Sequence, residues 1–278
     1  MHDYVIVDVF TDTPLRGNPV AVFFDGTDLP GEKMQLIARE LNLSETTFVL
    51  PPRAGGDVRV RIFTPVNELP FAGHPTLGTA IALGDSAPSD RLLMETGMGV
   101  IPFELTRVGG RVVSARMRQP NPVWEPYARA EEVLKALELT SSVLPVEVYR
   151  NGPRHVFVGL PDIPALSRVR PDLLALAHHP DVAVNCFAGS GPTWRLRMFS
   201  PAYGVAEDAA TGSAAGPLAV HLVRHGLVAP GTEIEIHQGV EMGRMSTMYA
   251  TMHGARDRVD TVDVSGSAVL VAKGVFHV

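Results

Sequence analysis

Three ionisable side chains stand at positions where acid–base chemistry could occur. Glu45 lies between a predicted helix and a predicted strand, and His74 and Asp208 each lie near the beginning of a predicted helix. A neutral imidazole shuttles protons near pH 7, and a carboxylate is a general acid or base when its pKa suits the task. Each also has an ordinary alternative role. His74 could be a turn histidine, Asp208 could be an acid that stabilises a helix N-terminus, and Glu45 could be a solvated loop acid. Sequence spacing alone does not bring the three together.

Two loops of small residues lead into helices beside these side chains. One is Ala72-Gly-His-Pro75 and the other is Ala210-Thr-Gly-Ser-Ala-Ala215. A helix start presents unpaired backbone N–H groups and the positive end of the helix dipole, so it is suited to an anion. A lone copy could be no more than a tight turn. Two copies predict facing helix starts that hold opposite sides of one small acid.

The elements that must position these residues follow from periodicity. Residues 58–64 alternate apolar and polar side chains, which predicts a strand with one solvated face. Further strands are predicted over residues 20–24, 46–50, 99–106, 111–119, 146–149, 155–160 and 195–199, with β character again over residues 259–278. Helices are predicted over residues 30–42, 74–83, 131–137, 171–177 and 211–225.

An internal repeat indicates the domain organisation. Arg61-Ile-Phe-Thr-Pro65 recurs as Arg197-Met-Phe-Ser-Pro201, and an acidic loop, a Gly-rich turn and an Ala-rich helix follow each copy. The repeat predicts an α+β fold of two homologous halves, residues 1–120 and 121–278, with the last strand, about residues 266–278, returning to the first half. Prolines at positions 120, 122 and 126 predict a stiff connector.

Composition excludes several classes of protein. The 278 residues are 45% hydrophobic and 19% charged, with a net charge of −6 and no Lys/Arg cluster, so neither disorder nor nucleic-acid binding is expected. The first residues lack a signal-peptide pattern, and no run of eighteen apolar residues suggests a membrane span, which predicts a cytoplasmic protein without membrane contact.

Metal, thiol and cofactor chemistry find no support in the sequence. Cys186 is the single cysteine, and a lone cysteine is usually a small buried hydrophobic residue. The adjacent pair His178-His179 is interpreted as surface, because neighbouring residues point in different directions. With no dinucleotide fingerprint or ligand cluster visible, we expect no metal and no organic cofactor.

Five motifs, in order along the chain, resemble the PhzF family of phenazine-biosynthesis proteins. They are Gly17-Asn-Pro-Val20, Asn42-Leu-Ser-Glu-Thr-Thr-Phe48, Arg61-Ile-Phe-Thr-Pro65, Glu68-Leu-Pro-Phe-Ala-Gly-His-Pro75 and Glu207-Asp-Ala-Ala-Thr-Gly-Ser213. The resemblance implies the fold of diaminopimelate epimerase, in which each half wraps a curved, mostly antiparallel sheet around a central helix. Epimerases of that fold use one cysteine from each half. This chain has a single cysteine, so two-thiol racemisation is excluded.

The resemblance also implies an activity. The family's phenazine-pathway isomerase acts on trans-2,3-dihydro-3-hydroxyanthranilate, a small anionic substrate, by shifting a proton from C3 to C1. It implies that Glu45 is the general acid/base, with His74 and Asp208 as further catalytic residues. The residues expected to bind the substrate are Gly73, Gly212, Ser213, Asn18, Ser44 and Thr211. A homodimer is expected, and the resemblance allows contacts with other phenazine-pathway enzymes.

Two alternatives stay open. The chain could be a PhzF-like isomerase for another small cyclic or amino acid, or a non-enzymatic ligand-binding or scaffolding subunit. The presence of Glu45, His74 and Asp208 together favours an enzyme.

Overall fold

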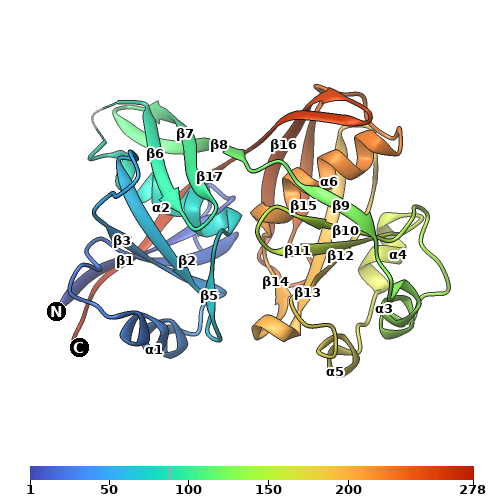
Figure 1. Cartoon of the computed structure of the whole chain (residues 1–278), viewed down its shortest axis with the longest axis horizontal. Helices are drawn as coiled ribbons and strands as arrows, with labels where there is room; N and C mark the ends of the chain where they lie inside the picture. Colours follow the sequence, from blue (N-terminus) through green and yellow to red (C-terminus); the bar gives the residue numbers. More distant parts are fainter. Residues whose placement is uncertain (88) are drawn as a thin grey trace.

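The computed structural model describes residues 1–87 and 89–278 and arranges them in two parts that lie side by side (Figure 1). The first part contains the strands β1 (His2–Val9), β2 (Asn18–Phe23), β3 (Glu45–Leu50), β4 (Val58–Phe63), β5 (Glu68–Leu69), β6 (Arg91–Thr96), β7 (Gly99–Val108) and β8 (Arg111–Gln119). Its helices are α1 (Gly31–Leu41) and α2 (Gly73–Gly84).

The second part is also rich in strands. These are β9 (Val123–Pro126), β10 (Glu147–Arg150), β11 (Arg154–Gly159), β12 (Ala183–Ser190), β13 (Thr193–Ser200), β14 (Val205–Asp208), β15 (Glu233–Gln238), β16 (Ser246–Ala255) and β17 (Arg258–Phe276). Its helices are α3 (Ala130–Ala136), α4 (Ile163–Arg168), α5 (Leu173–Leu176) and α6 (Gly212–Arg224), with the 3₁₀ turn η1 (Pro201–Tyr203).

Strands of the first part close around α2. β1 pairs with β2, β2 runs parallel to β3, and the ladder continues through β4, β6, β7 and β8 to β17, which returns to β1. Helix α2 is buried along nearly its whole length, because its small residues let the surrounding strands approach it. Gly78, for example, faces the side chains of Val7, Val9 and Val20.

The second part repeats the same order of pairings. β10 pairs with β11, β11 runs parallel to β12, β12 pairs antiparallel with β13, β13 runs parallel to β15, and β15 pairs antiparallel with β16. Helix α6 packs against β16 and β17 and is buried from Gly212 to Val223. The prediction of a mixed fold of helices and strands is confirmed.

Strand β17 connects the two parts. Its first residues pair with β16, residues 262–267 pair with β8, and residues 268–276 pair with β1. Figure 1 shows β17 crossing from one part to the other, with the two chain termini close together at one end. The largest hydrophobic core likewise contains side chains of both parts, among them Leu77 and Leu218. This shared core holds the two parts in contact.

The structure corrects several details of the sequence interpretation. Pro126 ends β9, which pairs only with β10 among the described strands, so this proline lies in an edge strand and not in the connector. The predicted helix over residues 171–177 is reduced to α5, whose start is capped by Asp172. His179 is buried and contacts the Tyr127 hydroxyl at 2.7 Å, whereas His178 is exposed.

Within residues 1–87 and 89–278, no helix is both long and apolar enough to cross a membrane.

Candidate active site

The N-termini of the two central helices meet between the two parts. Helix α2 begins at Gly73 and α6 begins at Gly212. A side chain on Gly73 would collide with the backbone of Gly212 and Ser213. A Cβ on Gly212 would lie 2.9 Å from the backbone nitrogen of His74. Only glycine allows this approach. The positive ends of both helix dipoles therefore converge on one place, as an anion-binding site requires.

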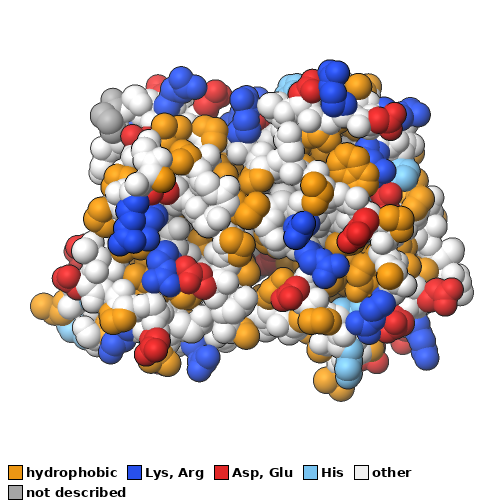
Figure 2. Space-filling view, viewed as in Figure 1, with side chains coloured by type: hydrophobic (Ala, Val, Ile, Leu, Met, Phe, Trp, Pro, Cys, Tyr) orange, Lys and Arg blue, Asp and Glu red, His pale blue; other side chains and the backbone are white. Residues whose placement is uncertain are grey.

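A cavity lies at this junction. It is lined by residues of both parts, namely Ser44, Glu45, Thr64, Leu69, Ala72, Gly73, His74, Pro153, His155, Ala183, Met198, Ser200, Tyr203, Val205, Asp208, Thr211, Gly212 and Ser213. Figure 2 shows the surface hollowed between the two parts, with basic and acidic side chains on both sides. A concave site with mostly apolar walls and a few polar groups is the usual form of a small-molecule site.

Glu45 and His74 face each other across 3.4 Å, from Oε2 to Nε2. Glu45 begins β3, in parallel register with Val20 of β2, and His74 lies in the first turn of α2. Both atoms are buried and have no hydrogen-bond partner in the described part of the chain. An acid between a helix and a strand is usually solvated, but the side chain of Glu45 is only 15% exposed.

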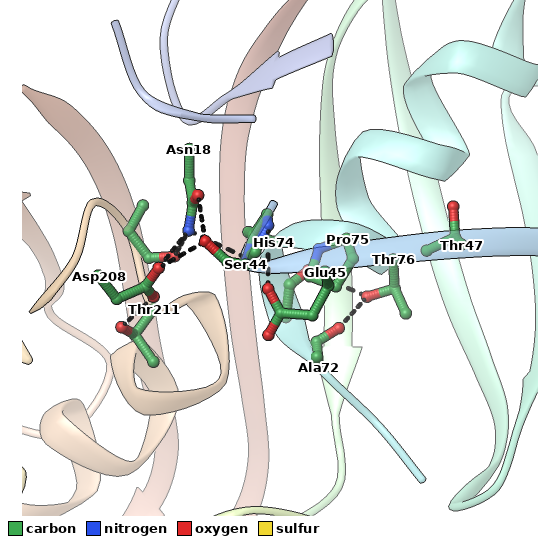
Figure 3. Close-up of polar contacts among 12 residues, drawn as sticks. Asn18, Ser44, Glu45, Thr47, Ala72, His74, Pro75, Thr76, Asp208 and Thr211 are labelled. Carbon is green, nitrogen blue, oxygen red and sulfur yellow. Dashed lines mark hydrogen bonds and ion pairs between the residues drawn. The ribbon is translucent and has the colours of Figure 1, made fainter. Parts of the chain in front are cut away.

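Asn18 joins groups from both parts. Its Nδ2 donates to Asp208 Oδ1 at 2.7 Å and to the Ala210 carbonyl at 2.9 Å, and its Oδ1 accepts from Ser44 Oγ at 3.1 Å. An amide nitrogen carries two hydrogens, and these two oxygens take both. The contact of 3.2 Å from Nδ2 to His74 Nδ1 is therefore not a third donated bond. Figure 3 shows Asn18 and Ser44 between Asp208 on one side and His74 on the other.

Asp208 is held by further hydroxyl donors. Thr211 Oγ1 donates to its Oδ2 at 2.7 Å, and Ser44 Oγ lies 3.2 Å from its Oδ1, so that the one Ser44 hydrogen is shared between Asp208 and Asn18 Oδ1. Gln238 orients Thr211, since the Thr211 backbone N–H donates to Gln238 Oε1. The carboxylate is thus fixed by donors from β2, the loop before β3 and the loop before α6.

Burial shifts the pKa of all three ionisable groups, upwards for the two carboxyl groups and downwards for the imidazole. It raises the pKa of Glu45 well above its ordinary value, and the nearby Asp208 charge raises it further. Burial lowers the pKa of His74 to about 3, against a hydrogen bond to the Pro19 backbone, so the imidazole is neutral at physiological pH. Burial also raises the pKa of Asp208 to about 6, and the bonds from Thr211, Asn18 and Ser44 oppose this shift.

The structure brings the predicted site residues together. The cavity is lined by Glu45, His74, Asp208, Gly73, Gly212, Ser213, Ser44 and Thr211. Asn18 lies behind them and contacts Asp208. Sequence reasoning missed several other lining residues. The repeat could have indicated Thr64 and Ser200, which occupy equivalent positions before Pro65 and Pro201.

One cluster could be considered for a metal. Glu147, His221 and His225 bring three ligand atoms within 4.8 Å of one another. His221 of α6 and His225, the residue directly after this helix, are four residues apart, and this spacing was a signal that the sequence prediction did not use. Arg224 Nη1 already donates to Glu147 Oε2 at 2.7 Å, so this carboxylate oxygen is paired with a positively charged side chain. These residues do not line the cavity.

Cys186 plays no part in the cavity. Its side chain is fully buried in β12, and burial raises the pKa of its thiol to about 12. The interpretation of this residue as a buried hydrophobic side chain is confirmed.

Comparison with known proteins identifies the family. Residues 7–274 match the PhzC-PhzF family, described as phenazine biosynthesis-like protein. The chain is also 63% identical over 274 residues to a trans-2,3-dihydro-3-hydroxyanthranilate isomerase from Pseudomonas aeruginosa, covering 99% of both chains. The chain belongs to the PhzF family.

Solved structures agree with this membership. The PhzF-family protein from Bacillus anthracis has a TM-score of 0.85 at 26% identity, and the match covers 98% of both chains. A hydroxyproline epimerase from Agrobacterium vitis has a TM-score of 0.67 at 14% identity, covering 98% of this chain and 90% of that one. At that identity the likeness concerns the fold alone: PhzF proteins and this epimerase share a strand-rich mixed α/β architecture.

Proposed function

We propose that this chain is an isomerase that converts trans-2,3-dihydro-3-hydroxyanthranilate into an aminoketone in phenazine biosynthesis. A full-length relative at 63% identity carries the name of this activity. The observation that carries the proposal is the position of Glu45, whose buried Oε2 faces a neutral His74 in a cavity formed by both parts. We assign the proton transfer to Glu45.

The proposed reaction shifts one proton. The Glu45 carboxylate removes the C3 hydrogen, and a proton is returned at C1. The C3–H bond breaks and a C1–H bond forms, while both double bonds of the conjugated diene move one position towards C3. The resulting C3 enol relaxes to a ketone. A group that both removes and returns a proton must be a weak acid, and the raised pKa of Glu45 suits this task.

The other residues bind and orient the substrate in this proposal. The helix starts at Gly73, Gly212 and Ser213 hold the carboxylate, because backbone N–H groups and both helix dipoles favour an anion there. His74 and Asp208 orient the hydroxyl and amino groups. Asp208 is positioned by Ser44, Thr211 and Asn18, and we assign these three to substrate binding.

The evolutionary origin of the fold is part of the proposal. The identical order of strand pairings supports two homologous halves of the diaminopimelate-epimerase type, each a curved sheet around a central helix. We place the boundary between residues 1–120 and 121–278, with about residues 266–278 returning to the first half. A cytoplasmic homodimer without a metal or organic cofactor is the form that we propose.

Turnover by the purified chain tests the function. The protein is incubated with the dihydro acid. Loss of the diene is followed by ultraviolet absorbance, and appearance of the ketone is followed by NMR. We expect conversion to the aminoketone. Tight binding without conversion would favour a ligand-binding subunit, and conversion of a different small cyclic acid alone would favour another substrate.

A further inference from the structure

A buried histidine in the second part lines the same cavity and has no role in the reaction as described. His155 lies in β11, is 1% exposed, and lines the cavity together with Ala183 of β12. Its Nε2 is buried and has no hydrogen-bond partner among residues 1–87 and 89–278. An unpaired polar atom in a buried position costs free energy, so such an atom beside a ligand cavity indicates a contact made by the ligand.

The repeated pairings show how the two walls of the cavity differ. In the first part Val20 of β2 pairs with Glu45 of β3, and in the second part His155 of β11 pairs with Ala183 of β12, in the same parallel arrangement. The second wall therefore has alanine where the first wall has its acid. On that wall the polar side chain belongs to the neighbouring strand, at His155.

Asn185 fixes the protonation of this imidazole. Its Nδ2 donates to the Ala183 carbonyl at 2.9 Å, and the same nitrogen lies 3.4 Å from His155 Nδ1. The second amide hydrogen therefore points to Nδ1, which accepts it. Burial lowers the pKa of His155 to about 3, so the ring is neutral and its one proton is on Nε2. The second wall thus offers a single neutral N–H donor.

We propose that His155 Nε2–H donates a hydrogen bond to the oxygen on C3 of the substrate and makes that oxygen a determinant of specificity. The inference rests on the proposed function. In the dihydro acid the carboxylate is assigned to the helix starts, and an amino group on a saturated carbon is an ammonium that only donates. The C3 oxygen is the acceptor that is left. It remains an acceptor when the hydroxyl becomes a ketone, so one donor serves both substrate and product.

Binding of two stable aromatic analogues tests this inference. 3-Hydroxyanthranilate carries the C3 oxygen and anthranilate lacks it, and both affinities are measured by calorimetry. We expect the wild-type protein to prefer 3-hydroxyanthranilate. His155→Phe keeps a ring of similar size without the donor, and we expect it to weaken that ligand roughly three- to tenfold, the effect of one hydrogen bond, with anthranilate unchanged. His155→Gln, whose amide also donates, should restore part of the preference.

His179→Phe is the matched control, because it removes another buried imidazole whose contact is Tyr127. It should leave both affinities unchanged. Equal losses for both analogues in His155→Phe would mean that His155 only shapes the cavity, and an unchanged preference would mean that it makes no contact with the oxygen. Either result overturns the inference while turnover of the dihydro acid still supports the proposed function. Absence of turnover, with neither analogue bound, would instead contradict the function.

A measurement on the wild-type protein covers the case in which the variants do not fold. In ¹⁵N-labelled protein, the Nε2–H signal of His155 should move on addition of 3-hydroxyanthranilate and stay in place on addition of anthranilate. A proton found on Nδ1, or equal shifts with both ligands, would overturn the inference.

Discussion

Glu45 Oε2 lies 3.4 Å from His74 Nε2, and both buried atoms lack a hydrogen-bond partner within the described chain. Among the described residues Nε2 has no hydrogen-bond partner, and Nδ1 of the same ring lies 3.2 Å from Asn18 Nδ2. Nε2 therefore faces the Glu45 carboxyl group alone among the ring nitrogens. This geometry places a neutral imidazole beside the Glu45 carboxyl group throughout a proton shift.

Replacement of Glu45 by glutamine tests the assigned base. Glu45→Gln keeps the size and the polar contacts of the side chain but cannot take a proton. General acid/base groups contribute about 10²–10⁴-fold in rate, and we expect kcat to fall by at least that amount with binding of 3-hydroxyanthranilate retained. Glu40→Gln, on the exposed face of α1, is the control and should keep full activity. A Glu45→Gln protein within tenfold of wild type would show that another group moves the proton.

The contact between the helix starts gives a second prediction. A methyl group on Gly73 collides with the Ser213 backbone, so Gly73→Ala must push α2 and α6 apart at the anion site. A displacement of about 1 Å in an active site can cost 10²-fold in rate, and we expect a loss of that order in kcat/KM. Gly31→Ala is the matched control at the start of α1, where the nearest atoms to the methyl group belong to the Arg61 guanidinium, a side-chain end, and not to backbone. Equal activities of the two variants would argue against a shared anion site.

Local sequence pattern predicted a good part of this fold. Helix α2 was expected over residues 74–83 and spans Gly73–Gly84, and the alternating segment at 58–64 became β4. Strands without alternation were missed: β1 and β12 are buried on both faces over much of their length, so they show no period of two. The edge strand β9 was missed because Pro126 at its end, with Pro120 and Pro122 before it, indicated a connector.

The site itself depended on distant contacts. The loops before α2 and α6 carry a recognisable pattern, and the motifs of the family pointed to Glu45. The distance from Glu45 to His74 depends on the packing of α2 against β2 and β3, which is a tertiary property. His155 reads as an ordinary strand residue in the sequence, and only its lack of a partner in a cavity distinguishes it.

The ion cluster at Glu147 gives a prediction about stability and pH. Arg224, Tyr149, His221 and His225 surround its Oε2, and these hydrogen bonds hold the pKa of Glu147 far below its ordinary value of 4.5, against the effect of burial. A lowered pKa means that the stabilisation is present above pH 4.5 and is lost as the pH falls below it. Glu147→Gln leaves Arg224 unpaired, and we expect a loss of about 3 kcal/mol at neutral pH.

Urea unfolding at a series of pH values checks this prediction. The difference in unfolding free energy between wild type and Glu147→Gln should shrink from about pH 5 downwards. A difference that stays constant down to about pH 3 would show that the charge of Glu147 does not contribute.

Removal of metal and thiol should not affect the reaction. We expect full activity after treatment with EDTA and dialysis, and in Cys186→Ser per folded molecule, because the thiol lies in the core away from the cavity. Loss of most activity on chelation, restored by a divalent ion, would contradict this and would direct attention to Glu147, His221 and His225.

The fate of the C3 hydrogen tests the central claim most directly. Dihydro acid deuterated at C3 is mixed with excess enzyme in ordinary water, and a single turnover is followed by rapid quench and NMR. If Glu45 carries the proton in a closed site, C3–D cleavage shows a primary isotope effect, and early product keeps some deuterium at C1, since exclusion of water slows exchange. Absence of an isotope effect in this experiment, together with an active Glu45→Gln protein, would contradict proton transfer by Glu45.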